Sequence, residues 1–226
     1  MSKFTKYPKH GGEAKIKRVK QPKDYFAEML KYRKNVYSQH GEDGVLEEIF
    51  KRLEISYGFA CEFGAWDGKK NSNTFNLVEK GWNCLMIEGD ERKFKDLLKV
   101  TQEYKNITPH CAYVSHIEGD QNSLNVIFDN HSLPKDFELL SIDVDSCDYQ
   151  IWKSLKNYQP KVVIIEHSGL DMDVIYKFGA QHKLHLEGST GFKPMKELGE
   201  EKGYCLLCDT YNLIFIRNDL KERFIA

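Results

Sequence analysis

The sequence predicts an α/β fold in which a doubly wound, mostly parallel sheet ends in an antiparallel strand. Strand-like and helix-like segments alternate through most of the 226 residues, as they do when helices cover both faces of a parallel sheet. The strand-like segments are continuously apolar, which is expected for strands that are buried on both faces. Only four residues join the last two strand-like segments, so these form a hairpin rather than a parallel crossover.

Each expected element follows from its local sequence. Apolar runs bounded by glycine or polar residues indicate strands, which are expected at residues 59–63, 84–87, 107–114, 139–144, 162–165, 204–208 and 213–216. Apolar residues at helical spacing indicate helices, which are expected at residues 24–34, 45–53, 74–80, 91–104, 123–130, 149–155 and 193–202. Residues 168–190 are expected to form a long loop that serves as a lid or a substrate wall.

Composition indicates a soluble, globular, cytoplasmic protein. Hydrophobic residues make up 41% and charged residues 30% of the chain, which is typical of globular domains. No apolar run approaches the roughly 20 residues that span a bilayer, and the lysine-rich N-terminus lacks the apolar core of a secretory signal. Most of the six cysteines lie in apolar segments, which indicates reduced thiols. Cys205 and Cys208 have zinc-knuckle spacing, but no second pair follows and strand side chains would point them to opposite faces.

Charge is distributed unevenly and divides the chain into two parts. Residues 1–35 hold 11 basic and 3 acidic residues, a net charge of +8, whereas the remainder has a net charge of −9. We expect a basic N-terminal extension with a helix at 1–35 and one domain at 36–226. Such an extension would touch nucleic acid or an anionic substrate, but a solvated arm that docks on the acidic body is the favoured interpretation.

Four of the expected strands end in acidic residues, which are Glu62, Glu88, Asp143 and Glu166. Ligands of an open parallel sheet bind at the carboxyl ends of its strands, so these acids mark a functional edge. The turn at Gly64 lets a ligand approach the backbone, and an acid in the position of Glu88 binds a ribose diol in nucleotide-binding folds. The pattern indicates a cofactor that contains a nucleoside.

Simpler interpretations stand beside this one. Glu62 and Asp67 would cap turns, Glu88 would be a solvated acid, and Trp66 would belong either to the core or to the wall of the site. The segment from Gly64 to Gly68 is not G-x-G-x-x-G, which counts against NAD as the cofactor.

The acids around residues 143 and 166 suggest a metal site. Asp143 and Asp145 are two apart on an expected strand, so their side chains lean to the same side. Glu166 and His167 end the adjacent strand. Three carboxylates and an imidazole would suit Mg²⁺ or Mn²⁺, which would acidify a substrate hydroxyl whose proton His167 then takes. Alternatively, the aspartates orient cofactor and substrate without a metal.

A set of ordered motifs connects this sequence to a known family. The motifs are Tyr37-Ser-Gln-His-Gly-Glu-Asp-Gly44, Cys61-Glu-Phe-Gly-Ala-Trp-Asp-Gly68, Asn71-Ser-Asn-Thr74, Met86-Ile-Glu-Gly-Asp90, Leu140-Ser-Ile-Asp-Val-Asp145 and Lys202-Gly-Tyr204. Through them the chain resembles class I S-adenosylmethionine-dependent methyltransferases, in particular the FkbM-like group. The resemblance extends over residues 37–217 and implies a Rossmann-like methyltransferase domain at 36–226.

The resemblance also implies which residues form the site. S-adenosyl-L-methionine would be held at its methionine portion by Glu62, Gly64, Ala65 and Asp67, and at its ribose by Glu88. The other cofactor residues would be Gln39, Asn73, Ala112 and Asp143. The catalytic residues, which follow from the residue pattern and not from the resemblance, would be His167, Asp143 and Asp145. Related sugar O-methyltransferases bind Mg²⁺ through acids at the ends of the same two strands, and here His167 would replace one of those acids. The metal ligands that the residue pattern gives are Asp143, Asp145, Glu166 and His167.

The function that the resemblance implies is O-methylation of a sugar or another small hydroxylated or phosphorylated metabolite in surface-glycan or natural-product biosynthesis. The expected partner is then a small-molecule or saccharide acceptor. We expect neither a membrane span nor a nucleic-acid partner, and whether the protein forms a homo-oligomer is left open. One alternative is a NAD-dependent oxidoreductase. The other is a non-catalytic nucleotide- or RNA-binding protein, for which the basic extension and its aromatic residues would bind RNA.

Overall fold

The structure is a computed structural model that describes residues 27–145, 147–167 and 190–224. Its elements are η1 (Ala27–Tyr32), α1 (Glu42–Arg52), β1 (Phe59–Phe63), α2 (Phe75–Glu79), β2 (Asn83–Glu88), α3 (Glu91–Glu103), β3 (Ile107–Cys111), α4 (Leu124–Asn130), β4 (Leu139–Ile142), α5 (Asp148–Ser154), β5 (Val162–Glu166), α6 (Phe192–Glu201), β6 (Tyr204–Asp209), β7 (Asn212–Arg217) and η2 (Asn218–Arg223), where η marks a 3₁₀-helix. Within the described residues, none of the helices combines the length and the apolar character that crossing a membrane requires.

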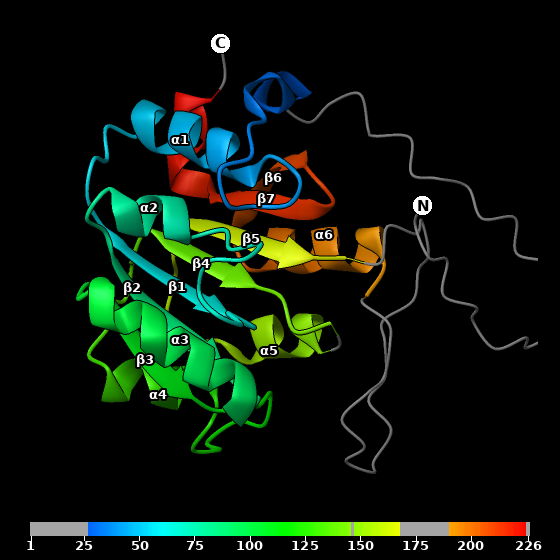
Figure 1. Cartoon of the computed structure of the whole chain (residues 1–226). Coiled ribbons are helices and arrows are strands. Elements are labelled where there is room, and N and C mark those ends of the chain that lie inside the picture. Colours follow the sequence, from blue (N-terminus) through cyan, green and yellow to red (C-terminus); the bar gives the residue numbers. More distant parts are fainter. Residues whose placement is uncertain (1–26, 146, 168–189, 225–226) are drawn as a thin grey trace, which may run out of the picture.

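The strands form one seven-stranded sheet in the order β3-β2-β1-β4-β5-β7-β6 (Figure 1). Strands β1 to β5 are parallel, and β7 lies antiparallel between β5 and β6. This confirms the predicted fold class, including the C-terminal antiparallel strand. Because Glu166 at the end of β5 pairs with Asn212 at the start of β7, the β6–β7 turn lies at the same edge as the carboxyl ends of the parallel strands.

Helices cover both faces of the sheet, as Figure 1 shows. Successive side chains of a strand point to opposite faces, so neighbouring residues of β1 belong to different clusters. Cys61 packs with α4, α5 and α6 on one face, and Ala60 packs with η1, α1, α2 and α3 on the other. Burial on both faces explains why the strands read as continuous apolar runs.

Three elements differ from the expectation. The strand expected at 107–114 ends at Cys111, because its partner, β2, ends at Glu88, the residue opposite. The strand expected at 139–144 ends at Ile142, opposite the last residue of β1. The helix expected at 24–34 is described only from residue 27, where it is the short 3₁₀-helix η1. Its Met29 is buried in the same cluster as α1, so this segment packs on the domain.

The expectation that Cys205 and Cys208 point to opposite faces is wrong. A bulge in β6 shifts the register between Leu206 and Cys208. Because the extra residue reverses the alternation, Cys208 and the partly buried Cys205 both pack in the cluster of α1 to α3.

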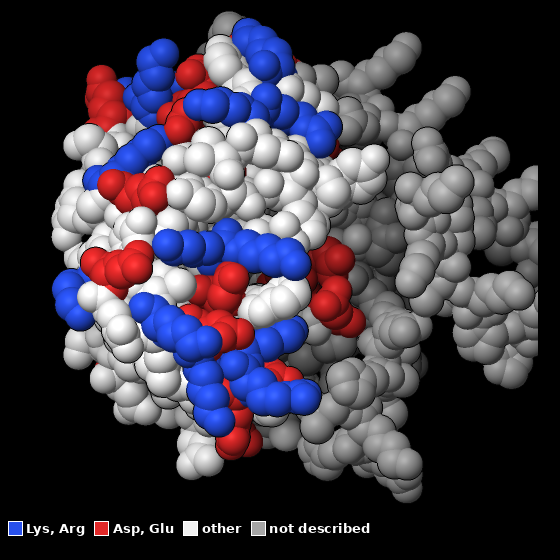
Figure 2. Space-filling view, in the orientation of Figure 1, with Lys and Arg blue, Asp and Glu red and all other residues white. Residues whose placement is uncertain are grey.

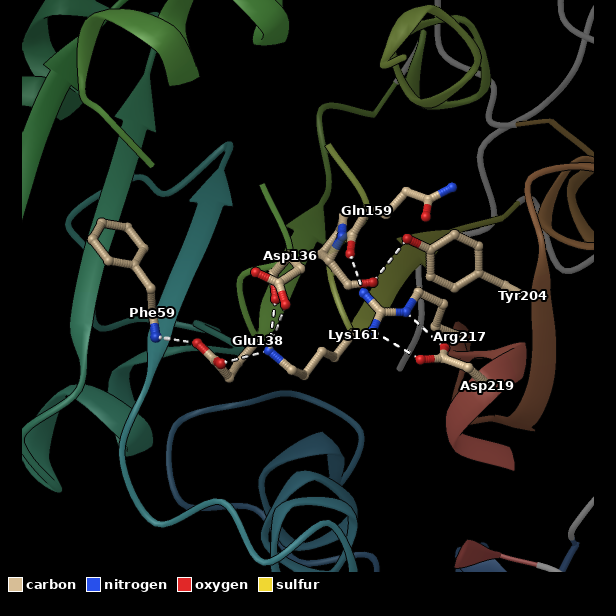
Figure 3. Close-up of polar contacts among 9 residues, drawn as sticks. Phe59, Asp136, Glu138, Gln159, Lys161, Tyr204, Arg217 and Asp219 are labelled. Carbon is tan, nitrogen blue, oxygen red and sulfur yellow. Dashed lines mark hydrogen bonds and ion pairs between the residues drawn. The ribbon is translucent and has the colours of Figure 1, made fainter. Parts of the chain in front are cut away.

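The opposite edge of the sheet is braced by a polar network, drawn in Figure 3. The half-buried Lys161 donates to Glu138 Oε1 over 2.8 Å and to the carbonyl oxygen of Asp136 over 2.7 Å. The other oxygen of Glu138 accepts from the backbone N–H of Phe59 over 2.7 Å. Arg217 forms a two-contact ion pair with Asp219 and also donates to the carbonyl of Gln159. These contacts tie the first residues of β1, β4 and β5 and the end of β7 together.

Replacing Lys161 with methionine is expected to lower the free energy of unfolding by about 1–2 kcal/mol, because the carboxylate of Glu138 loses its cation in a half-buried site. Urea unfolding measures this. The control is Lys156→Met, which breaks the exposed pair of Lys156 with Glu118 and should change little. Equal losses in both variants would show that the network adds nothing beyond a surface ion pair.

Candidate functional site

The carboxyl ends of the parallel strands bring the predicted residues to one edge of the sheet. The turn after β1 is built around Gly64, whose φ is 77°. The backbone N–H groups of Gly64 and Ala65 both donate to the carbonyl oxygen of Ile87 over 3.1 Å. A Cβ atom on Gly64 would lie 1.7 Å from the carbonyl oxygen of Asp143. Glycine is therefore required both by the backbone conformation and by the close approach of the segment after β4.

Glu62 holds the loop that follows this turn. Its Oε2 accepts from the hydroxyl groups of Ser72 over 2.5 Å and Thr74 over 2.6 Å, and its Oε1 accepts from the backbone N–H of Asn73 over 2.9 Å. Asn73 in turn donates to the hydroxyl of Ser141 over 3.0 Å. Burial raises the pKa of Glu62, although these hydrogen bonds oppose the shift. These contacts give Glu62 the loop-organising role of the simpler interpretation, and its contact with the methionine portion stays a prediction.

Asp67 and Trp66 form the outer part of the same turn. Asp67 Oδ1 accepts from the backbone N–H groups of Lys69 over 2.9 Å and Lys70 over 2.8 Å, so Asp67 caps the turn. Trp66 has a φ of 49° and is 37% exposed, so it is not a core residue, and its place in the wall of the site stays a prediction. The ammonium groups of Lys70 and Lys93 lie 4.5 and 4.9 Å from its ring centre. Figure 2 shows basic and acidic side chains intermixed on the face of the molecule that carries α1, α2 and α3.

Glu88 is fixed at the end of β2 by two backbone donors. Its Oε2 accepts from the N–H of Trp66 over 2.8 Å, and its Oε1 accepts from the N–H of Asp90 over 2.7 Å. Each carboxylate oxygen has a second lone pair for a further donor. The backbone N–H of Ala112 donates to the carbonyl of Glu88 over 3.2 Å. The structure therefore places Glu88 and Ala112 side by side. The carboxylate of Glu88 is fixed by backbone hydrogen bonds and is not freely solvated.

Three of the four predicted metal ligands come together. Carboxylate oxygens of Asp143, Asp145 and Glu166 lie within 4.8 Å of one another, and no other cluster of this kind occurs among the described residues. The premise behind this prediction was wrong, because β4 ends at Ile142 and Asp145 has a φ of 58° in the loop that follows. Asp143 as a residue is exposed, but loss of hydration at its carboxyl group raises the pKa of Asp143 above its usual range, and repulsion from Glu166 adds to the shift.

Replacing Asp143 with asparagine is expected to stabilise the protein at neutral pH. A carboxyl group whose pKa is raised by folding favours the folded state while protonated, and this contribution is lost as pH rises from the unfolded-state pKa of about 3.9 through the folded-state pKa. The free energy of unfolding of the asparagine variant should therefore rise relative to that of the wild type as pH increases across this window. Urea unfolding between pH 4 and 9 measures the difference, with Asp96→Asn at an exposed ion pair as control. A difference independent of pH would show that the titration of Asp143 is not its cause.

His167 is not part of the acid cluster that Asp143, Asp145 and Glu166 form. Its Nε2 is 3.2 Å from Asp209 Oδ1, at the end of β6, and its side chain is 3% exposed. The ring packs against Phe192, with 5.8 Å between ring centres. The structure thus pairs His167 with an acid that the sequence did not single out, 42 residues away.

The segment around Gln39 is held by two buried acids, Asp43 and Glu42. Asp43 Oδ2 accepts from three successive backbone N–H groups, at Val36, Tyr37 and Ser38, over 2.7–2.8 Å. Glu42 Oε1 accepts from the hydroxyl of Thr210 over 2.8 Å, and its Oε2 accepts from the N–H of His40 over 2.8 Å. The sequence indicated these acids only as the start of a helix. Gln39 itself is exposed on this segment, where its role beside the cofactor stays a prediction.

The sequence matches no protein-family model and no curated protein. Among solved structures, the N-terminal domain of EvdMO1 with SAH bound aligns over 79% of this chain and 80% of that one, with a TM-score of 0.50 and 12% identity. The chain has the Rossmann-like fold of class I methyltransferases.

Two further structures with this fold have lower TM-scores. The CurJ carbon methyltransferase has a TM-score of 0.49 and 10% identity over 78% of this chain, which spans about half (52%) of the CurJ chain. A putative O-methyltransferase from Klebsiella pneumoniae has a TM-score of 0.46 and 11% identity, covering 84% of this chain and 88% of that one. These likenesses concern the fold.

Proposed function

We propose that this protein transfers the methyl group of S-adenosylmethionine to a hydroxyl group of a sugar or another small hydroxylated metabolite, in cytoplasmic surface-glycan or natural-product biosynthesis. The observation that carries the proposal is the contact between the Gly64 turn and the end of β2. Gly64 and Ala65 donate to Ile87, and Trp66 donates to Glu88. A turn without a Cβ therefore lies beside an acid with free lone pairs, in a fold shared with an SAH-bound domain.

The residues at this edge would hold the cofactor as follows. Gly64 and Ala65 would lie beside the methionine portion, with Asp67 and Asn73 on the loop that follows them. Glu88 would accept hydrogen bonds from the ribose hydroxyl groups, and Ala112 would border the adenine. The acids Asp143, Asp145 and Glu166 would favour the positively charged sulfonium over the neutral thioether that remains after transfer.

The cofactor supplies an activated methyl group, and the residues of this chain align the acceptor and remove its proton. The acceptor oxygen forms a bond to the methyl carbon as the bond from that carbon to sulfur breaks, and the acceptor proton passes to His167. Asp209 would hold the imidazole of His167 through their 3.2 Å contact. Asp143 and Asp145 would accept hydrogen bonds from neighbouring hydroxyl groups of the acceptor.

A divalent metal ion is the second part of the proposal. The carboxylates of Asp143, Asp145 and Glu166 are hard oxygen ligands of the kind that Mg²⁺ and Mn²⁺ prefer, and their spacing within 4.8 Å fits a shared ion. Such an ion would acidify the acceptor hydroxyl and relieve the repulsion among the three acids. His167 would then act as the base rather than as a ligand. Activity that persists in EDTA, with no metal in the purified protein, would rule out the proposed metal ion.

Calorimetric titration with S-adenosylmethionine and S-adenosylhomocysteine, with and without Mg²⁺, tests the proposal, with NAD⁺ as control. We expect both methionine nucleosides to bind and NAD⁺ not to bind. The antiparallel β7 supports this expectation, because dinucleotide-binding folds keep their strands parallel. Failure of both nucleosides in a folded sample would overturn the methyltransferase proposal.

RNA binding by the basic extension is the remaining alternative. Residues 1–26 lie outside the described part of the structure. Deleting residues 1–23 and titrating RNA at several salt concentrations tests the idea, because basic side chains that contact phosphates give a steep salt dependence. An RNA affinity that the deletion leaves unchanged would eliminate it.

Replacing His167 with alanine is expected to lower kcat by about 100-fold or more, as removal of a general base does. The affinity for S-adenosylhomocysteine should change little, because Glu88 and the Gly64 turn are untouched. Steady-state kinetics and calorimetry separate the two effects. The control is His131→Ala, since His131 is also a paired histidine, with His110 at 3.1 Å, but is only half-buried. Wild-type turnover of His167→Ala would rule out this base.

A further inference from the structure

The turn between β6 and β7 carries an exposed tyrosine in an unfavourable backbone conformation. Tyr211 has a φ of 90° and is 66% exposed. A bulky residue rarely adopts a positive φ, and such strain persists where surrounding contacts impose it. In this turn the N–H of Tyr211 donates to Asp209 Oδ1 over 2.9 Å, and the N–H of Thr210 donates to the carbonyl of Asn212 over 3.0 Å. Glycine would meet the same conformation without strain, so local stability does not explain the tyrosine ring.

The ring of Tyr211 extends an aromatic surface that begins at His40. The two ring centres are 4.6 Å apart with an angle of 43° between the planes. Glu42 joins the two segments, because its carboxylate accepts from the N–H of His40 and from the hydroxyl of Thr210. We call the side chains of His40 and Tyr211 the aromatic wall.

The aromatic wall is connected to the proposed base. Asp209 Oδ1 accepts from the N–H of Tyr211 and also contacts Nε2 of His167. Asn212, next to Tyr211, pairs with Glu166 at the end of β5. The wall therefore lies at the edge that also carries Glu166 and His167, on the side away from Glu88, because β5 and β7 lie beyond β4 in the sheet.

We infer that His40 and Tyr211 form the acceptor subsite and stack on the ring of a neutral, hydroxylated acceptor. An exposed aromatic ring binds the C–H face of a sugar ring through apolar contact, while carboxylates accept hydrogen bonds from its hydroxyl groups. Without a metal ion, Asp145, Glu166 and Asp209 would repel a phosphorylated acceptor more strongly than Arg33, which donates to the carbonyl oxygen of His40, would attract it. The inference rests on the proposed function and narrows its substrate class to uncharged ring-bearing alcohols.

Saturation-transfer NMR with a panel of methyl glycosides, in the presence of S-adenosylhomocysteine, tests the subsite. The variant is Tyr211→Gly, which removes the ring and relieves the strained φ, so its melting temperature should rise. We expect the signal of at least one glycoside to fall at least fivefold in Tyr211→Gly and to persist in Tyr211→Phe. The matched control is Tyr57→Ala. Tyr57 is 59% exposed and precedes β1 at the opposite edge.

The outcomes separate the subsite from the proposed function, because calorimetry measures the affinity for S-adenosylhomocysteine independently. Unchanged nucleoside binding with a glycoside signal that depends on Tyr211 supports the inference. Nucleoside binding without such a signal, or a signal equally strong in Tyr211→Gly, overturns the subsite alone. A Tyr211-dependent glycoside signal in a protein that binds no nucleoside supports the subsite and overturns the methyltransferase. A stronger signal from sugar phosphates than from methyl glycosides overturns the inferred neutrality.

Discussion

Replacing Glu88 with glutamine is expected to weaken the binding of S-adenosylhomocysteine by about 30–150-fold, or roughly 2–3 kcal/mol. The wild-type carboxylate accepts from the N–H groups of Trp66 and Asp90. An amide presents an NH₂ group to one of these donors, so one backbone N–H loses its acceptor. Under the proposed function, the ribose hydroxyl groups would lose a charged acceptor as well, and hydrogen bonds to charged groups are the stronger ones.

Calorimetric titration measures this effect, and Glu103→Gln is its control. Glu103 also carries a carboxylate, but it is exposed and contacts only Lys69, at 3.8 Å, among the described ion pairs. A Glu88→Gln protein that unfolds more easily but binds the nucleoside as tightly as the wild type would contradict the ribose role. Glu88 would then serve only to hold the backbone from Trp66 to Asp90.

Replacing Gly64 with alanine is expected to lower the free energy of unfolding by about 3 kcal/mol or more, since it combines backbone strain with a steric clash. The added Cβ would lie 1.7 Å from the carbonyl oxygen of Asp143, and that atom belongs to the backbone and cannot rotate away. The turn and the segment after β4 must separate, which also displaces the acids of the metal proposal. Urea unfolding and nucleoside titration measure the two consequences.

Gly81 offers a matched control for this substitution. Its φ is 89°, close to the 77° of Gly64, but a Cβ there would meet nothing within 4 Å. Gly81→Ala therefore isolates the cost of the backbone conformation, about 1 kcal/mol. If the two variants lose the same stability, the close approach at Gly64 is not what makes glycine necessary there.

The strands and the strand-end acids could be predicted because both follow from short-range sequence. Burial on two faces makes each strand apolar over its whole length, and Glu88 and Glu166 stand where that apolarity ends. Gly64 is likewise visible, since a glycine after a buried strand marks a turn that a ligand can approach.

The acceptor side of the site could not be predicted in the same way. The contact of His167 with Asp209 joins residues 42 apart, and the contact of Glu42 with Thr210 joins residues 168 apart. Both depend on the placement of β7 between β5 and β6, which a hairpin pattern does not specify. The bulge that turns Cys205 and Cys208 to one face could not be predicted from the sequence either. Both faces of the strand carry apolar residues, so the change in alternation leaves no pattern in the sequence.

The insertion of β7 between β5 and β6 sets an order of assembly. The hydrogen bonds of Glu62 to its loop and of the Gly64 turn to the end of β2 join residues at most about two dozen positions apart, so a chain leaving the ribosome can complete them early. The link from Glu42 to Thr210 closes only after nearly the whole chain has been made, and closing so distant a contact is slow. The short-range bonds of the half of the edge proposed for the cofactor can thus form before the long-range bonds of the half proposed for the acceptor.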